Sequence, residues 1–186
     1  MKREAVLLAA AQVFNERGYH LTTLDAIAEK LNVTKPTVYY YLSNKEAILC
    51  ECFRTGCGVL VDAADEIEES ELTGIDKLAA FMRKYAEAMT TDFVMNVVRL
   101  DLYGLEPEMQ DEIGELKSAV DRRFRTYIEE GIANGTIAEC DPKMTAFAIA
   151  GALNWIGRWY QPDGPLQPTE IADLIVERLV EGLRSQ

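Results

Sequence analysis

The chain has 186 residues, of which 48% are hydrophobic and 27% charged, and its formal net charge is −12. This composition is typical of a globular protein and excludes intrinsic disorder. No apolar run approaches the roughly 18 residues that a membrane span requires. The N-terminus resembles a secretory signal, but Glu4 and Gln12 interrupt its apolar residues, which recur at helical spacing. We therefore expect a cytoplasmic protein with one mid-sized domain, or a small domain joined to a larger one.

Cap and turn signals predict an all-α fold of about nine helices, and no segment has the pattern of a strand. Gly18 is expected to end the first helix and Thr23 to cap the second, while Asn32 supplies a tight turn after it. Ser43 and Glu46 have capping-box spacing, and Asp141-Pro142 opens a later helix. The expected helices cover residues 4–17, 24–31, 35 onward, about 44–69, 74–90, 93–103, 107–133, 142–160 and 168–184.

The segment LNVTKPTVYYYLSNKEAI, residues 31–48, places a short helix directly after another short helix. At 100° per residue Val38 faces inward, while Pro36 and Tyr40 lie on the opposite face. Two short helices joined by a tight turn are typical of a helix-turn-helix, whose second helix lies in the major groove of DNA. A helix hairpin with an aromatic core remains the alternative on periodicity alone.

The longer segment FNERGYHLTTLDAIAEKLNVTKPTVYYYLSNKEAIL resembles the DNA-binding domain of TetR-family transcriptional repressors. Two positions depart from the family pattern, because Leu42 replaces a phenylalanine and Pro36 replaces a common glycine. The features that match are Gly18-Tyr19, Thr22-Thr23, Ile27-Ala28, Val33-Thr34, Val38-Tyr39, Tyr41, and Lys45-Glu46 followed by Leu49.

The resemblance implies which residues contact DNA. Threonine and tyrosine hydroxyls and lysines bind phosphates, and several of them also reach base edges. Carried over from the resemblance, Lys35, Thr37 and Tyr40 are expected nearest the bases, and Thr34, Tyr39 and Lys45 mainly on phosphates. The full set of expected contacts is Thr34, Lys35, Pro36, Thr37, Tyr39, Tyr40 and Lys45.

The charge is divided unevenly along the chain. Residues 1–54 carry 7 basic and 6 acidic residues, a net charge of +1, whereas residues 55–186 carry 12 and 25, a net charge of −13. Residues 1–54, the head of the chain, are nearly neutral. This head should bind DNA weakly as a monomer and with strong salt dependence. We expect a helix-turn-helix domain at 1–47 and a helical ligand-binding and dimerisation domain at 48–186.

The last two expected helices offer a dimer surface. The segment MTAFAIAGALNWIGRWY is apolar almost all round, more than one face of a surface helix needs. TetR-like proteins dimerise through their last two long helices, so the resemblance implies a homodimer on a near-palindromic double-stranded DNA operator, with recognition helices ~34 Å apart. The alternative is that both helices form only intramolecular core.

Aromatic and methionine stripes in the middle of the chain are candidates for an effector pocket, although such stripes also form plain core. The resemblance implies a large apolar effector. The candidate pocket residues are Phe81, Tyr85, Met89, Phe93, Tyr103, Phe124, Tyr127, Asn154, Trp155 and Trp159.

The ending GALNWIGRWYQPDGPLQPTEIADLIVERL resembles TetR-family regulators that respond to acyl-CoA thioesters. An acyl-CoA is therefore one candidate effector, and an aromatic or cationic compound of an efflux system is the other. The arginines that could meet coenzyme A phosphates are Arg99, Arg122, Arg123, Arg125 and Arg158.

No feature predicts an enzyme, a metal site or a cofactor. The single histidine, His20, lies in a turn, and the chain has no phosphate-binding glycine loop or nucleophile elbow. Cys50 and Cys52 would point about 200° apart on one helix, which does not suit a shared metal ion. A helical ligand-binding scaffold without DNA function remains the rival from another class.

Overall fold

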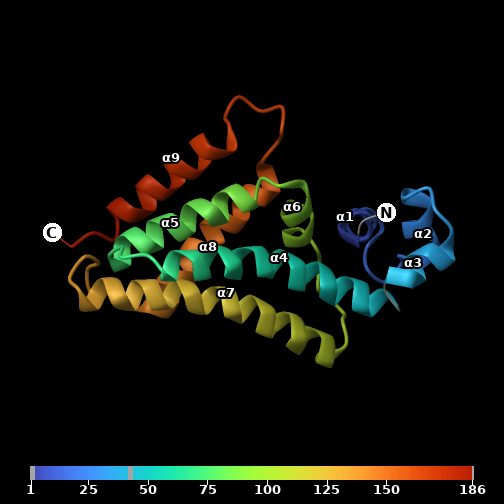
Figure 1. Ribbon diagram of the computed structural model, residues 1–186, viewed down its shortest axis with the longest axis horizontal. Coiled ribbons are helices and arrows are strands. Elements are labelled where there is room, and N and C mark those ends of the chain that lie inside the picture. Colours follow the sequence, from blue (N-terminus) through green and yellow to red (C-terminus); the bar gives the residue numbers. More distant parts are fainter. Residues whose placement is uncertain (1–2, 42–43, 186) are drawn as a thin grey trace. The chain divides into compact units, whose positions relative to one another are not determined.

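The computed structural model describes residues 3–41 and 44–185, apart from the side chains of Tyr39 and Tyr41. Over these residues the chain forms helices and no strand, which confirms the predicted all-α fold (Figure 1). None of the described helices has the length and apolar character needed to cross a membrane. The helices are α1 (Arg3–Arg17), α2 (Leu24–Lys30), α3 (Lys35–Tyr41), α4 (Lys45–Glu68), α5 (Gly74–Ala88), α6 (Asp92–Val98), α7 (Pro107–Ala133), α8 (Pro142–Trp159) and α9 (Pro168–Glu181).

Two helices end three or more residues earlier than the sequence predicts. The helix expected at 93–103 ends at Val98, because Asp101 Oδ1 accepts a hydrogen bond from the Tyr103 backbone N at 2.9 Å and Gly104 adopts φ 74°. The helix expected to reach 184 ends at Glu181. Beyond it the Leu183 carbonyl accepts a hydrogen bond from Ala138 N at 2.9 Å, so the last residues pair with the turn after α7.

The chain forms two compact units. Unit 1 comprises Met1–Gly56 and Asp92–Leu116, and unit 2 comprises Cys57–Thr91 and Lys117–Gln186. Helices α4 and α7 each begin in unit 1 and end in unit 2. The boundary expected after residue 47, between a DNA-binding and a ligand-binding domain, does not coincide with the boundary between the compact units. It stays a prediction.

The core of unit 1 is built from the apolar faces of short helices. Helix α1 packs against α2, α3 and α6. Burial of these side chains from water is the main favourable term in folding such a unit. The fully or nearly fully buried side chains include Val6, Leu7, Val13, Phe14, Ile27, Val38, Ile48, Leu49 and Phe53.

The local signals around α2 act as the sequence predicts. Thr23 Oγ1 accepts a hydrogen bond from Ala26 N at 3.2 Å and caps α2. Asn32 has φ 53°, the left-handed conformation that lets α2 stop and α3 start three residues later. For α4, the expected capping residue Ser43 lies outside the described residues. Within them Asn44 Oδ1 accepts a hydrogen bond from Ala47 N at 2.7 Å.

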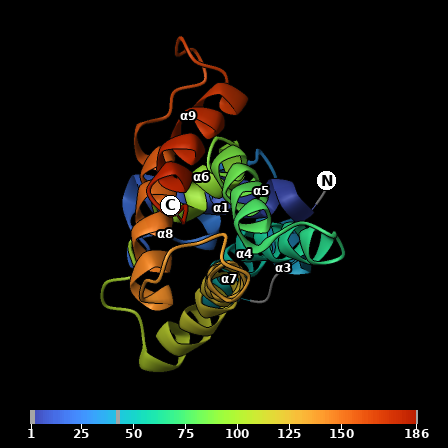
Figure 2. The same cartoon turned by 90° about the vertical axis from the view of Figure 1, so that its left-hand side faces the viewer.

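Unit 2 is organised around α5, which packs against both α9 and α8 (Figures 1 and 2). The N-terminus of α5 comes very close to α7, since a Cβ atom added at Gly74 would lie 2.2 Å from Gly131 N. Lys77 is 9% exposed and its ammonium lies 3.1 Å from Glu130 and 3.6 Å from Glu68. This ion-paired lysine joins α4, α5 and α7 at one end of the unit.

Candidate nucleic-acid interface and ligand site

Helix α3 presents one face to solvent and buries the other. Val38 is completely buried, whereas Tyr40 is 84% exposed. Thr34, Lys35 and Pro36 are also exposed, and Thr37 is half-buried. The side chain of Tyr39 lies outside the described residues. The exposed face therefore carries an aromatic hydroxyl, a lysine and threonines, the groups that contact phosphates and base edges.

Two polar contacts order this face. Lys35 Nζ lies 2.8 Å from Asp25 Oδ2 on α2. The hydroxyls of Thr34 and Thr37 lie 2.9 Å apart and share a hydrogen bond. No sequence pattern singles out Asp25, because its ion pair with Lys35 depends on how α2 and α3 cross.

Lys45 is tied to the turn between α1 and α2. Its ammonium donates to the carbonyls of Tyr19 at 2.9 Å and His20 at 3.3 Å, and lies 4.3 Å from the centre of the Tyr19 ring. The Tyr19 hydroxyl in turn donates to Glu46 Oε1 at 3.2 Å. Lys45 therefore holds the start of α4 against the head, and its expected phosphate contact stays a prediction.

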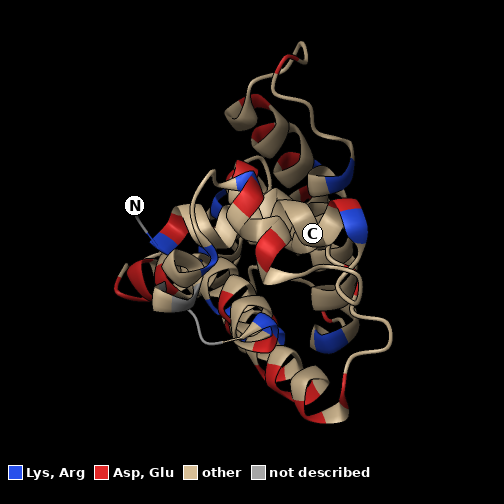
Figure 3. Ribbon diagram, turned by 90° about the vertical axis from the view of Figure 1, so that its right-hand side faces the viewer, with Lys and Arg blue, Asp and Glu red and all other residues tan. Residues whose placement is uncertain are grey.

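The ionised residues do not form a broad basic face. Figure 3 shows Asp and Glu spread over many helices of the chain, with Lys and Arg between them. The exposed lysines near the head, Lys30 and Lys35, each pair with a carboxylate, Lys30 with Glu16 Oε1 at 2.6 Å. The described residues of the head therefore do not build a large positive field.

Four of the residues expected in an effector pocket form one ring cluster inside unit 2. Phe81 lies with its centroid 4.7 Å from that of Phe124 and 5.9 Å from that of Tyr127, and Tyr85 lies 5.5 Å from Phe124. All four rings are buried. Rings packed in this way supply a large apolar surface on α5 and α7.

The ring cluster has polar tips. The Tyr85 hydroxyl donates to Asn154 Oδ1 on α8 at 2.8 Å, and the Tyr127 hydroxyl donates to the Ala64 carbonyl at 2.8 Å. Burial raises the pKa of Tyr85 above its ordinary value, with the charges of Cys57 and Asp121 adding to the effect. Burial, and after it the charge of Glu68, raises the pKa of Tyr127 to about 12.

The other expected pocket residues lie elsewhere. Met89 is buried at the end of α5, next to unit 2's core. Phe93 and Tyr103 belong to unit 1, where Phe93 is half-buried and Tyr103 is 88% exposed. Trp155 and Trp159 point outward from α8, with 64% and 43% of their surface exposed. Their assignment to a pocket stays a prediction without geometric support.

One pair among the candidate arginines stands out in unit 2. Arg125 pairs with Asp121 on the same turn of α7, yet Asp121 Oδ1 and Arg125 Nε are buried and have no hydrogen-bond partner among the described residues. Buried polar atoms without a partner are costly and often belong to a binding site. Arg123 pairs with Asp65, whereas Arg122 and Arg158 lie on exposed positions and Arg99 is half-buried in unit 1.

Comparison with known proteins agrees with this geometry. Residues 71–183 match the tetracyclin repressor-like C-terminal domain, and residues 6–52 match the bacterial regulatory proteins of the tetR family. The chain belongs to the TetR family. It is therefore a helix-turn-helix, DNA-binding transcriptional regulator, and α2 and α3 lie within the matched N-terminal segment.

Relatives of this TetR-family chain match it along nearly its whole length. It is 28% identical over 184 residues to the HTH-type transcriptional regulator YhgD of Bacillus subtilis, covering 98% of this chain and 96% of YhgD. It resembles FadR from Bacillus subtilis in complex with stearoyl-CoA, with 27% identity, 97% of each chain covered and a TM-score of 0.77. It also resembles AibR in complex with isovaleryl coenzyme A and operator DNA, with 26% identity, 96% of this chain and 98% of AibR covered, and a TM-score of 0.81.

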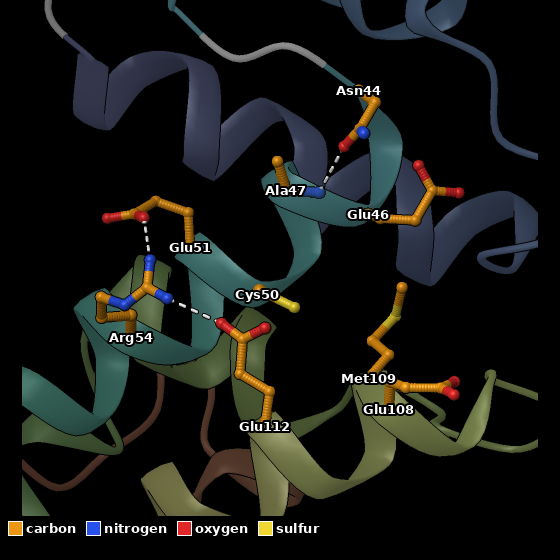
Figure 4. A pocket seen from close by; sticks show the side chains of 9 residues that line it. All are labelled: Asn44, Glu46, Ala47, Cys50, Glu51, Arg54, Glu108, Met109 and Glu112. Atoms are coloured by element: carbon orange, nitrogen blue, oxygen red, sulfur yellow. Dashed lines mark hydrogen bonds and ion pairs between the residues drawn. The ribbon is translucent and has the colours of Figure 1, made fainter.

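Unit 1 of this TetR-family regulator also contains an open cleft of about 420 Å³ between the first halves of α4 and α7 (Figure 4). Arg54 bridges its two sides, donating to Glu51 at 2.5 Å and to Glu112 at 2.7 Å. No group of three potential metal ligands occurs among the described residues. Four carboxylates against one guanidinium would repel a polyphosphate. The cleft is lined by Asn44, Glu46, Ala47, Cys50, Glu51, Arg54, Glu108, Met109 and Glu112.

Proposed function

We propose that this TetR-family regulator is a ligand-responsive repressor that binds a near-palindromic operator as a homodimer and leaves it when a large apolar effector binds. The observation that carries the proposal is the exposed face of α3. A tyrosine that is 84% exposed, on the same short helix as an exposed lysine, contributes nothing to a core and suits a major groove.

The outer face of α8 supports the homodimer. Met144, Phe147, Trp155 and Trp159 are 60%, 49%, 64% and 43% exposed, and the exposed Ala148 and Gly151 continue the same stripe. An apolar stripe of this length, with two tryptophans, is typical of a protein interface. On α9 most apolar side chains pack within the chain, but Leu174 remains 53% exposed.

The interior of unit 2 supports an effector with an apolar body and a polar group. The buried rings of Phe81, Tyr85 and Phe124 supply the apolar surface. The unpartnered atoms of Asp121 and Arg125 supply polar groups beside it. FadR and AibR are known with acyl-CoA thioesters, so an acyl-CoA is the first candidate effector. The net charge of −13 over residues 55–186 supports the second candidate, a cationic aromatic compound of an efflux system.

Release requires a difference in affinity between two conformations. The effector must bind the conformation that does not fit DNA more tightly than the one that does, or it shifts nothing. Helices α4 and α7 run from unit 2 into unit 1, so a change around the ring cluster reaches the DNA-binding unit along continuous helices.

The test begins with selection of binding sites from a random double-stranded DNA library by the purified chain. Fluorescence anisotropy of the selected DNA at fixed moderate salt is then measured with a panel of acyl-CoAs and a panel of cationic aromatic dyes. We expect sequence-selective binding that one acyl-CoA chain-length class releases. Release by the dyes alone would replace the acyl-CoA with the efflux-type effector, and failure to select any sequence would contradict the repressor itself.

A further inference from the structure

An exposed carboxylate stands beside the base-reading helix. Asp25 lies in the first turn of α2 with 65% of its side chain exposed, and its Oδ2 lies 2.8 Å from Lys35 Nζ on α3. A negative charge next to a DNA-binding surface is repelled by phosphates. In the major groove it gains a favourable contact only where a base presents an amino group, because the amino groups are the hydrogen-bond donors there.

The Lys35–Asp25 pair presents a donor and an acceptor side by side. In a G·C pair, guanine O6 and cytosine N4 lie next to each other in the major groove at about 2.9 Å, since they are hydrogen-bonded to one another. This spacing matches the 2.8 Å between Nζ and Oδ2. The ion pair can therefore meet a G·C edge without separating.

We propose that Asp25 is a specificity-determining residue which, with Lys35, reads one G·C base pair in each half-site. Lys35 donates to guanine O6 or N7, and Asp25 accepts from the N4 amino group of the paired cytosine. The inference rests on the proposed repressor function and adds to it the identity of one base pair of the operator.

The other three base pairs fit less well. A C·G pair in the same place sets the N4 amino group against the Lys35 ammonium, and an A·T pair sets the N6 amino group there, so donor meets donor. A T·A pair offers O4 and N6 in the required order, but the thymine methyl stands where guanine N7 would accept a second bond. The expected order is G·C, then T·A, then A·T and C·G.

A purely structural role for Asp25 makes a different prediction. A carboxylate in the first turn of α2 also interacts favourably with the helix dipole, and an exposed ion pair adds little stability. Both effects change how well the unit folds without changing which base is preferred. Base preference at a single position is therefore the readout that separates the two roles.

The experiment compares the wild type with Asp25→Ala, Lys35→Ala and Glu16→Ala. Glu16 is a matched control, because its Oε1 forms a similar ion pair with Lys30 at 2.6 Å, between α1 and α2 and with no residue of α3 in the pair. Each variant is checked by circular dichroism and used to select sites from the same random library. Dissociation constants are then measured for operators carrying each of the four base pairs at each position.

We expect the wild type and Glu16→Ala to prefer G·C over C·G by roughly tenfold or more at one symmetric position. Asp25→Ala and Lys35→Ala should each reduce that preference to about threefold or less at the same position. If both variants keep the wild-type preference at every position, Asp25 does not read DNA, and the inference fails while the repressor stands. If the wild type selects no sequence, the proposed function fails.

Discussion

Single residues set the local geometry on which the DNA-binding motif depends, and Asn32 is the clearest case. With φ 53° it is the one non-glycine residue with positive φ among the described residues, and the α2–α3 turn depends on it. Val33 N donates to the Ala28 carbonyl at 3.0 Å across this turn. Asparagine tolerates the left-handed conformation better than most residues, so the residue type at this position explains the turn.

Asn32→Ala should therefore destabilise the chain by roughly 1–2 kcal/mol. This is the cost of the left-handed conformation for a residue whose Cβ lies too close to the backbone carbonyl. Asn32→Gly, which removes the Cβ, should remain close to the wild type. Urea unfolding followed by circular dichroism measures both. Equal loss of stability in the two variants would show that the amide side chain, not the backbone conformation, is what matters.

The thiol of Cys52 gives a pH dependence. It is fully buried, donates to the Leu7 carbonyl at 3.5 Å, and burial, with a smaller contribution from the charge of Glu51, raises its pKa from 9.0 to about 12. The folded state therefore binds the proton more tightly than the unfolded state. The contribution of this thiol to the free energy of unfolding is complete below the unfolded pKa. It is lost as pH rises from about 9 toward about 12.

We expect the free energy of unfolding to fall above pH ~9 with a contribution from Cys52 of up to about 1.4 kcal/mol per pH unit. Cys52→Ala should reduce that slope, even though the missing atom lowers stability at every pH. Urea titrations at about pH 8, 9 and 10 compare the two slopes. Parallel curves for wild type and variant would contradict the assignment.

Sequence reasoning at the residue scale succeeds where the chemistry is local. Thr23, Asn32 and the Asp141-Pro142 pair act through their own backbone neighbours, and the structure confirms each. It is weakest for large apolar side chains. Asn154 bonds to the buried Tyr85, whereas its neighbour Trp155 points to solvent, and a pattern of aromatic spacing cannot tell a buried face from an uncovered one.

At the scale of elements, α8 has two apolar faces with different uses. Ile149, Leu153 and Ile156 are buried against the chain, and the opposite stripe with Phe147 and Trp155 is exposed. A helix that is apolar all round is expected in a buried position. A second copy of the chain would bury the exposed stripe. The dimer surface stays a prediction, and the apolar pattern of α8 alone could not separate its exposed residues from its buried ones.

Trp155→Lys should turn the dimer into a monomer of 20.9 kDa, because a charge at the centre of an apolar interface is left without a partner. Tyr103→Lys is the matched control, since Tyr103 is an exposed aromatic outside α8. Light scattering after size-exclusion chromatography gives both masses. A wild-type chain that is already monomeric would contradict the proposed homodimer. A Trp155→Lys variant that stays dimeric would place the interface elsewhere.

For the whole molecule, the division of charge along the chain bears on how DNA is bound. Residues 1–54 have a net charge of +1 and residues 55–186 one of −13, so a single head has little attraction for DNA. The helices and the family could be predicted because helix start and stop signals, and the residues that match the TetR family without a gap, are local features of the sequence. The four rings of the cluster are expected together, but their packing against one another, like the contact of Asp25 with Lys35, could not be foreseen because it depends on how separate helices cross.

Operator affinity should therefore depend steeply on salt. If two heads together neutralise about six to ten phosphates, the association constant falls by roughly 10³ to 10⁵ between about 50 and about 200 mM salt. Trp155→Lys should lose about half of that slope, because a monomer makes half the contacts. Anisotropy titrations at several salt concentrations measure the slopes, and an identical slope for the two proteins would argue against binding as a dimer.

DNA reading by the exposed face of α3 is tested by the affinity of Tyr40→Ala for the selected operator and for a scrambled sequence. We predict that Tyr40→Ala loses about tenfold or more in operator affinity and keeps its weak binding to scrambled DNA, whereas Tyr103→Ala binds both like the wild type. If Tyr40→Ala retains full operator affinity and selectivity, α3 does not read the operator as described, and the account is contradicted.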